Sequence, residues 1–399
     1  MPEGALAGIR VIDATQMLAG PMAGTRLGDL GADVIKVEPP TAGEFNRTHG
    51  FADARANGEM TTFLAMNRNK RSLAIDLKAP AGRAVIHELV RTSDVFIQNF
   101  RQGTATRLEV DYATLSAINP KIIYCSISGY GASGPYRDRP GQDLVMQGYS
   151  GSMFSVGKQG DPPIPSALWA ADVMTGYQSV IGILAALTAR QHTGQGQHVE
   201  VDMLSVVLDC QLQELVTYLN AGVAPDRSEE TGAHGSIPAP YGSYETSDGW
   251  LNLAMCPLPA LGEVLDNDWL RSLTEYHDGH VHRDEIYRTI RHAFKGRTTQ
   301  EWIDLCDQHG VWAGPVYDFP ALVKDPHIIA ENYIVEQPQK HGGAARTVRP
   351  PIKLSGTPTA IRRGAPALGE HSREILVELG FGSDEINGLL NDDVIAIAE

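Results

Sequence analysis

Short apolar runs alternate with longer amphipathic stretches through the first 130 residues. The run at 9–13, IRVID, predicts a buried strand, and the pattern at 21–30 predicts a helix that Gly31 ends. The alternating segment 32–38 predicts the next strand, which completes a strand–helix–strand unit. Further strands are predicted at 72–77, 94–99 and 121–128, with a helix at 81–92. This order predicts an α/β fold with a Rossmann-like, open parallel sheet between helices.

The pattern continues and then changes near residue 222. A helix is predicted up to about residue 189, a strand at 197–203 and one helix at 204–220. Residues 222–242 are rich in glycine, proline and polar side chains, which predicts a linker. A hairpin centred on Asp248-Gly249 and several helices follow, and a second linker is predicted at 337–351. The two linkers, in a chain of 399 residues, predict two domains.

Composition narrows the functional classes. Hydrophobic residues make up 42% and charged residues 20%, as in soluble globular proteins, and the net charge of −15 disfavours a nucleic-acid partner. The four cysteines are far apart, so they predict neither a disulfide framework nor a zinc site and fit a reducing cytoplasm. The N-terminus has no secretory signal pattern, so we expect a cytoplasmic protein. The apolar stretch 168–190 contains charged residues, which predicts a buried helix rather than a membrane span.

Two basic loops stand out in this acidic chain. NRNKRS at 67–72 carries Arg68, Lys70 and Arg71, and the glycine-rich loop 129–143 carries Arg137 and Arg139. Each is either a solvated loop or a phosphate-binding loop. Because both adjoin strands of one predicted sheet, they could meet in a shared crevice. The glycines at 20–31 lack the GxGxxG spacing of a dinucleotide site, and the histidines at 277–282 lack further metal ligands, so no metal site is predicted.

Asp172 lies at the edge of the apolar stretch LWAADVMTGYQSVIGILAAL, which covers residues 168–187. Aspartate is a preferred helix N-cap, so one interpretation is purely local. The other is a nucleophilic carboxylate on a rigid helix start, where backbone N–H groups and the helix dipole keep it ionised. The two interpretations are compatible, because a capping position would hold the carboxylate anionic.

Several of these motifs closely resemble class III CoA-transferases, the formyl-CoA transferase and carnitine CoA-transferase group. The resemblance includes Ala171-Asp172 through Met203, LAGIRVID with LAGP and LGDLGADVIKVEPP at 6–40, NRNKRSLAIDLK, DVFIQNFRQG, SGYG with GPYRDRPGQD, and PALGEHSREIL. The motifs occur in family order over nearly the whole chain. They imply transfer of CoA from an acyl-CoA donor to a carboxylic acid acceptor through a covalent intermediate on Asp172, with no tightly bound cofactor and no metal.

The resemblance also implies binding residues and an architecture. The CoA thioester would contact Gln16, Leu18, Ala19, Ile75 through Lys78, Asn99, Phe100, Arg107 and Arg139. Formyl-CoA transferases carry an arginine where this chain has Pro39, and this chain lacks their run of consecutive glycines. The implied fold is an interlocked homodimer. Each subunit would have a large Rossmann-like domain (1–221 and 338–399) and a smaller α+β domain (222–337).

Three alternatives remain at this point. An α-methylacyl-CoA racemase would share Asp172, but it needs a second base where this chain has Gln142, and an amide cannot take up a proton at neutral pH. A dinucleotide-dependent oxidoreductase could use the same type of sheet, although the fingerprint for it is absent. A non-catalytic CoA-binding protein is the third alternative, and the presence of Asp172 argues against it.

Overall fold

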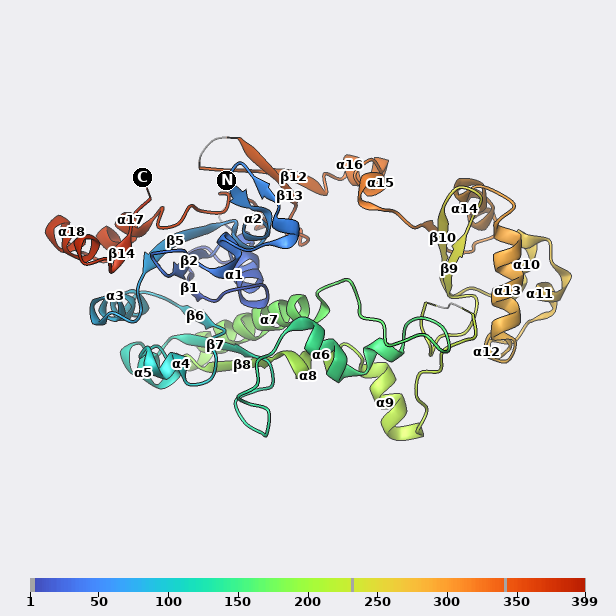
Figure 1. Cartoon of the computed structure of the whole chain (residues 1–399), viewed down its shortest axis with the longest axis horizontal. Coiled ribbons are helices and arrows are strands. Elements are labelled where there is room, and N and C mark those ends of the chain that lie inside the picture. Colours follow the sequence, from blue (N-terminus) through green and yellow to red (C-terminus); the bar gives the residue numbers. More distant parts are fainter. Residues whose placement is uncertain (1–3, 231–232, 341–342, 399) are drawn as a thin grey trace. The chain divides into compact units, whose positions relative to one another are not determined.

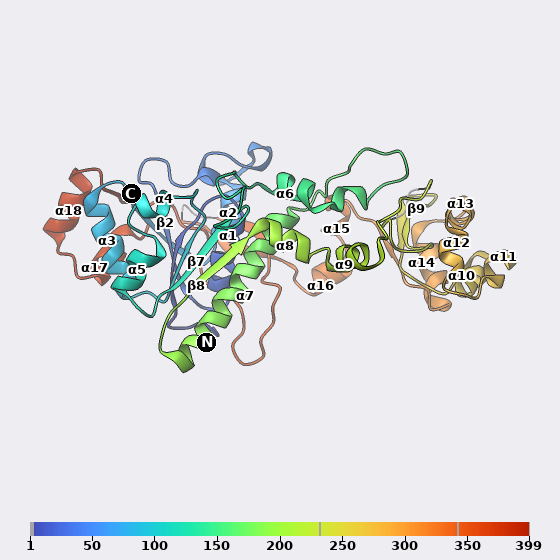
Figure 2. The same cartoon turned by 90° about the horizontal axis from the view of Figure 1, so that it is seen from below.

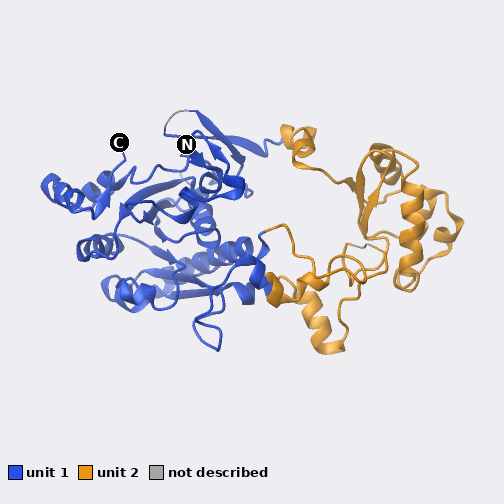
Figure 3. Ribbon diagram, in the orientation of Figure 1, with its two compact units in different colours: residues 1–146, 169–207, 331–399 blue, residues 147–168, 208–330 orange. Residues whose placement is uncertain are grey.

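The computed structural model describes residues 4–230, 233–340 and 343–398; parts of both predicted linkers and of the N-terminal segment judged for a signal lie outside these ranges. The chain divides into two compact units, which Figure 3 distinguishes by colour. Unit 1 consists of residues 1–146, 169–207 and 331–399, and unit 2 consists of residues 147–168 and 208–330.

These limits differ from the predicted domain limits: residues 147–168 and 208–221 belong to unit 2, and residues 331–337 belong to unit 1. Hydrogen bonds explain the difference. The backbone N–H of Gln159 donates to the carbonyl oxygen of Ser228 at 2.7 Å, and the Arg227 guanidinium donates to the Phe154 carbonyl at 3.0 Å. The side chain of Gln211 donates to the Ser150 carbonyl at 2.9 Å. Residues 147–168 are thus tied to a segment some 60 residues later in the chain.

Unit 1 contains a seven-stranded, mostly parallel sheet (Figure 1). The β14 strand, which joins β5 at one edge, is antiparallel. From β5 to β8 the order is that of a Rossmann fold, in which the third, second and first strands are followed by the fourth, fifth and sixth. The expected parallel α/β sheet is therefore present. Along the sheet the strands are β14 (Ile395–Ala396), β5 (Lys70–Ile75), β2 (Asp33–Glu38), β1 (Arg10–Ala14), β6 (Val95–Gln98), β7 (Ile123–Ser128) and β8 (His198–Asp202).

Helices cover both faces of this sheet (Figure 2). On one face, α3 (Pro80–Arg91), α5 (Tyr112–Ile118), α17 (Ser372–Glu378) and α18 (Ser383–Asn391) pack over strand residues such as Ile12 and Ile35. On the other, α1 (Ala19–Asp29) and α7 (Ala170–Thr193) pack over Val11 and Val34. Successive strand side chains point to opposite faces, so each central strand supplies both cores.

Helix α7 is long and apolar enough to cross a membrane by length and composition alone. Core helices of soluble proteins meet the same criterion, and 44% of its most apolar stretch is buried within the chain. Its Val180, Ile183 and Ala186 belong to the core shared with α1 and the sheet. This packing agrees with the prediction of a buried helix.

Unit 2 has its own core, built around a three-stranded sheet with the order β11-β10-β9. The predicted hairpin is β9 and β10, which are antiparallel and turn at Asp248-Gly249. The elements are β9 (Gly242–Glu245), β10 (Trp250–Leu253), α10 (Leu258–Leu265), α11 (Asp268–Ser272), α12 (Asp278–Val281), α13 (Arg283–Phe294), α14 (Thr299–Gln308), β11 (Ala313–Pro315), α15 (Phe319–Leu322) and α16 (Pro326–Ala330).

Two further predictions need correction. The single helix expected at 204–220 is two helices, α8 (Met203–Asp209) and α9 (Leu212–Ala221). The linker expected at 337–351 contains β13 (Ala344–Val348), which pairs with β12 (Ile334–Pro338) and places Ala345 in a small core with Met60 and Phe63. The remaining elements are β3 (Arg55–Ala56), β4 (Glu59–Met60), α2 (Thr61–Asn67), α4 (Thr104–Arg107), α6 (Asp143–Ser150) and three 3-10 turns (Phe45–Arg47, Phe51–Asp53, Ser152–Phe154).

Candidate active site

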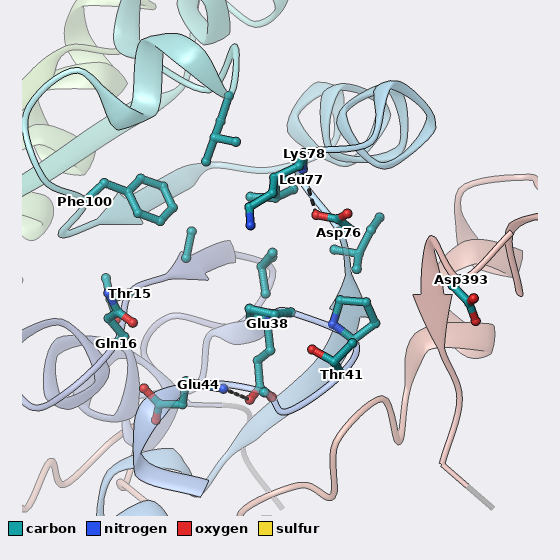
Figure 4. Close-up of a pocket in the computed structure, with 17 residues that line it drawn as sticks. Thr15, Gln16, Glu38, Thr41, Glu44, Asp76, Leu77, Lys78, Phe100 and Asp393 are labelled. Atoms are coloured by element: carbon teal, nitrogen blue, oxygen red, sulfur yellow. Dashed lines mark hydrogen bonds between the residues drawn. The ribbon is translucent and has the colours of Figure 1, made fainter. Parts of the chain in front are cut away.

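A pocket of about 500 Å³ opens at the carboxyl ends of the central strands of unit 1 (Figure 4). The chain order reverses between β1 and β6, and such a switch point is where open α/β sheets bind their ligands. Lining residues follow β1, β2, β5 and β6, and one comes from just before β14: Ala14, Thr15, Gln16, Val37, Glu38, Pro39, Pro40, Thr41, Gly43, Glu44, Ile75, Asp76, Leu77, Lys78, Phe100, Leu108 and Asp393.

Most of the predicted CoA-binding residues lie in or beside this pocket. Gln16, Ile75, Lys78 and Phe100 line it, and the Lys78 side chain extends into it (Figure 4). Asn99 is tied to it, because the Asn99 carboxamide accepts from the Gln16 N–H at 3.0 Å and donates to the Gln16 carbonyl at 2.8 Å. This reciprocal pair bridges the turns after β1 and β6.

The other predicted residues are placed differently. Leu18 is the N-cap residue of α1, and Ala19 is its first residue, directly after the pocket-lining turn. Arg107 is exposed at the end of α4, next to the pocket residue Leu108. Arg139 lies in the loop after β7, where its guanidinium stacks on Tyr136 at 4.1 Å, and it is not among the residues that line the pocket.

Asp172 occupies the first turn of α7, as the third residue of the helix. A backbone hydrogen bond from Ala19 reaches its carboxylate, so α7 brings it to the start of α1. Gly176, one turn later on the same face, explains why the helices approach so closely: a Cβ there would lie 2.9 Å from the Ala19 carbonyl oxygen. The spacing of aspartate and glycine in the sequence therefore encodes the contact between Asp172 and the α1 start.

The N-cap interpretation of Asp172 is wrong in its detail. The residue at the N-cap position is Trp169, whose side chain makes no capping bond. Instead the Asp143 carboxylate, at the start of α6, accepts from the backbone N–H groups of Ala171 at 2.8 Å and Asp172 at 3.2 Å. Asp143 thereby supplies the cap from another segment.

The expected effect of the helix start, which is to keep Asp172 ionised, is opposed by the surroundings of the carboxyl group. Burial, followed by the charge of Asp143, raises the pKa of Asp172 to about 6, and the hydrogen bond from Ala19 only partly offsets them. The carboxyl group is therefore mostly ionised above pH 7 and mostly protonated below pH 5. A carboxylate that is poorly solvated and destabilised in its charged form is a better nucleophile than one in bulk water.

The basic loop at 67–72 is not a phosphate-binding loop. Arg68, Lys70 and Arg71 are at most 4% exposed. The Arg68 guanidinium makes two bonds to Asp29, at 2.9 and 2.7 Å, and Arg71 pairs with Asp33 at 2.6 Å. These cations form ion pairs within the protein, at the start of β5, and cannot reach a ligand in the pocket.

Lys70 belongs to a buried ionic group beneath the pocket. Its ammonium donates to Asp13 at 2.7 Å and to the Pro21 carbonyl and Asn67 Oδ1 at 2.8 Å each. Burial lowers the pKa of Lys70 to about 8, so the group is charged at neutral pH. Gly24 makes room for this pair, since a Cβ there would lie 2.7 Å from the Asp13 carboxylate.

Sequence reasoning missed several polar residues around the site. Glu38 and Glu44 line the pocket but are buried, and Glu38 makes two bonds of 2.7 Å to the Arg47 guanidinium. The alternation of apolar and polar residues in 32–38 could have pointed to Glu38, because only Asp33, Lys36 and Glu38 are polar in this strand. Glu44 and Asp393 gave no such signal. Asp143 is the last residue of the motif GPYRDRPGQD, but only the fold shows that it meets the start of α7.

The chemistry available here is that of a mostly buried carboxyl group, Asp172, whose backbone donor Ala19 directly follows the turn that lines the pocket. Within residues 4–230, 233–340 and 343–398, no three His, Cys, Asp or Glu side chains are grouped so that they could hold a metal ion. Asp172 can attack an electrophilic carbonyl, and the Ala19 N–H can stabilise negative charge next to it.

Comparison with known proteins assigns a family to this arrangement. The sequence model of CoA-transferase family III matches residues 6–372. The chain is 37% identical to a succinate–glutarate CoA-transferase of Agrobacterium fabrum, over 94% of this chain and 95% of that one. It is 35% identical to the beta subunit of a succinyl-CoA–L-malate CoA-transferase of Chloroflexus aurantiacus, over 98% of both.

A solved structure agrees with these sequence matches. The crystal structure of a CAIB/BAIF family protein from Brucella suis superposes with a TM-score of 0.83 and 32% sequence identity. The superposition covers 94% of this chain and all of the other. The match thus extends over nearly the whole fold, including both compact units.

Proposed function

Since the chain belongs to CoA-transferase family III and is a CoA-transferase, we propose that it exchanges CoA between two carboxylic acids through covalent intermediates on Asp172. One observation carries the proposal. Asp172 is a carboxyl group with a raised pKa, held by a backbone N–H at the start of α1, beside the pocket at the switch point of the sheet.

The first half of the reaction acylates the enzyme. The ionised Asp172 carboxylate attacks the thioester carbonyl of the donor; the C–S bond breaks, CoA leaves as the thiolate, and a mixed anhydride remains on Asp172. The thiolate then attacks the Asp172 carbonyl of that anhydride. The donor acid leaves as a carboxylate, and Asp172 carries CoA as a thioester.

The second half runs through the same bonds in reverse order with a new acid. The acceptor carboxylate attacks the aspartyl thioester, which releases the thiolate and forms a second anhydride. The thiolate attacks the acceptor carbonyl, which yields the new acyl-CoA and restores the Asp172 carboxylate. Every step exchanges one activated carboxyl for another, so the cycle needs no net proton transfer and no electron transfer.

The pocket residues have defined parts in this cycle. Gln16, Ile75, Lys78 and Phe100 would hold the CoA portion, and Leu18 and Ala19 would lie along its path to Asp172. The Ala19 N–H would stabilise the charge that develops on Asp172 and its oxyanions. We assign Asn99 to positioning Gln16, and Arg107 and Arg139 to the outer, phosphate-bearing part of CoA.

We further propose that the donor carries a dicarboxylic acyl group. Both relatives described above bear names with succinyl or succinate and a second dicarboxylic acid, and they match nearly the whole chain. Succinyl-CoA is therefore the first donor to use, with glutarate and malate as the first acceptors.

The decisive experiment is intact-protein mass spectrometry after mixing the enzyme with succinyl-CoA, followed by hydroxylamine trapping and peptide mapping. We expect a trapped adduct on the peptide that contains Asp172 and none in the Asp172→Asn variant. An adduct on another residue would overturn the assignment. No adduct, together with deuterium exchange at the α-carbon of a 2-methylacyl-CoA, would indicate the racemase reaction, which the amide at Gln142 argues against.

We also propose that two copies of the chain form the working enzyme. Helix α9 has no buried residue, although Leu212, Val216 and Leu219 form an apolar stripe on it and are 59%, 46% and 69% exposed. An amphipathic helix with an uncovered apolar face is typical of a protein–protein contact. A second copy of this chain is the partner that the resemblance to interlocked homodimers implies.

A further inference from the structure

The turn between β1 and α1 is held by side chains from other segments. The Thr15 carbonyl accepts from the Lys36 ammonium, and the Asn99 carboxamide pairs with both backbone groups of Gln16. The Met17 N–H donates to Glu44 at 3.2 Å, and its carbonyl accepts from the Asn46 carboxamide at 2.5 Å. Three consecutive residues of the turn thus rely on distant side chains for their backbone hydrogen bonds.

Met17 has a strained backbone. Its φ is +70°, in the left-handed region that side-chain-bearing residues rarely adopt. Such a conformation persists only where the surroundings enforce it, and it occurs preferentially at functional sites. Here the side chains that enforce it are Glu44 and Asn46, which are 4% and 5% exposed. Glu44 directly precedes the 3-10 turn Phe45–Arg47, and Asn46 lies within it.

The strained residue lies two positions before Ala19, whose N–H reaches Asp172. We propose that Glu44 and Asn46 are positioning residues: by holding Met17 in its left-handed conformation they aim the Ala19 N–H at the Asp172 carboxylate. This inference rests on the proposed function of Asp172. It gives a role to the segment 44–47, which sequence reasoning passed over.

The segment 44–47 is itself firmly anchored, as a positioning device requires. Arg47 makes two bonds of 2.7 Å to Glu38, and the Glu44 N–H donates to the same carboxylate at 3.1 Å (Figure 4). The Glu44 carboxylate faces Lys36 at 3.6 Å and accepts from Asn67 at 3.1 Å. Glu44 and Asn46 therefore hold Met17 from a fixed base.

The test is the pH dependence of enzyme acylation by succinyl-CoA in Asn46→Ala and Asn46→Leu, the second of which keeps the approximate size of the side chain but loses its donor without adding a charge. The charged group that faces Asp172 is Asp143, and it is unchanged in both variants. We expect acylation at pH 7 to slow about tenfold, the worth of one hydrogen bond to a charged group. The acid limb should move to higher pH than in the parent, because the carboxylate has lost its donor.

Rescue distinguishes positioning from general damage. Glycine adopts positive φ without strain, so Met17→Gly added to Asn46→Ala should return the acid limb and most of the acylation rate toward the parent. The matched control is Asn119→Ala, since the Asn119 carboxamide likewise holds two backbone carbonyls, of Val90 and Ser93, at 2.9 Å each. Asn119→Ala should lower the melting temperature without shifting the acid limb of the acylation rate.

The variant Asp143→Asn tests whether the acid limb of the acylation rate reports the ionisation of Asp172. Removal of the negative charge of Asp143 should lower the pKa of Asp172 and so move the acid limb to lower pH. An unchanged limb and rate in both Asn46 variants, with the acyl group still trapped on Asp172, would overturn the positioning role alone. A rescue variant as slow as Asn46→Ala would overturn it as well. An acyl group trapped elsewhere would overturn the proposed function instead.

Discussion

At the scale of single residues, the central feature is the charge state of Asp172. Two carboxylates meet at the start of α7: Asp143 caps the helix through the N–H groups of Ala171 and Asp172, and its charge helps to raise the pKa of Asp172 to about 6. Asp172, the proposed nucleophile, is thus less stable in its charged form than an exposed aspartate. Function and stability make opposite demands on this position.

Asp172→Asn should stabilise the protein while it abolishes transfer. The pKa of Asp172 is about 6 in the folded protein and 3.8 ordinarily, so the folded state holds the proton more tightly and stability falls as pH rises from about 4 to 6. Above pH 7 the parent carries this full cost, at most about 3 kcal/mol. Urea denaturation should show a gain for the variant at pH 7.5 that shrinks at pH 4.5. An equal loss at both pH values would contradict it.

Gln16, Ile75, Lys78 and Phe100, which the resemblance implied as CoA-binding residues, lie at or just after strand ends and line one pocket. Their contact with CoA stays a prediction, as does the covalent role of Asp172. The partners that set the chemistry were not predictable. Asp143 is separated from Ala171 by 28 residues, and nothing local to Asp143 indicates that it caps another helix.

At the scale of elements, strand β5 shows why a basic motif misleads. Its first residues are cationic, and such a run usually lies in solvent. Here Arg68 and Arg71 meet Asp29 and Asp33, which α1 and β2 place beside the start of β5. The pairing depends on the parallel register of β2 and β5, which is a property of the folded sheet. Sequence alone shows the charges but not their partners.

Arg68→Ala should therefore destabilise the enzyme without weakening CoA binding. It removes the two bonds from Arg68 to Asp29, which is 2% exposed. Asp29 keeps Arg26 and Asn69 as side-chain donors, and a loss of about 3 kcal/mol is typical for such a buried pair. The contrasting variant is Lys78→Ala, an exposed residue that lines the pocket. It should raise KM for succinyl-CoA about three- to tenfold and leave the melting temperature unchanged. A raised KM with Arg68→Ala would restore the phosphate-binding interpretation.

At the scale of the whole molecule, the chain builds two units by leaving unit 1 and returning to it twice. Chain length and the two predicted linkers indicated two units, and the inserted position of the second was implied by the family resemblance. The exact limits were not, because residues 147–168 have the composition of a surface loop and join unit 2 only through bonds to residues such as Ser228.

We expect the chain to form a dimer in solution. Light scattering coupled to gel filtration should give twice the 43.1 kDa of one chain at micromolar concentration. The double variant Leu212→Glu/Leu219→Glu, on the apolar stripe of α9, should weaken this association at least tenfold, because two charges would enter an apolar contact. Val377→Glu is the matched control on α17, where Val377 is 60% exposed. A monomeric parent would contradict the proposal.

The pairing of β14 with β5 has a consequence for biosynthesis. β14, which covers the edge of β5, is translated more than 300 residues after it. Until then the nascent chain exposes an unpaired strand edge above a half-built core, and unit 2 is translated in the meantime. The sheet of unit 1 is thus completed only after unit 2 has been translated. The growing polypeptide is therefore a natural client for a chaperone that shields strand edges.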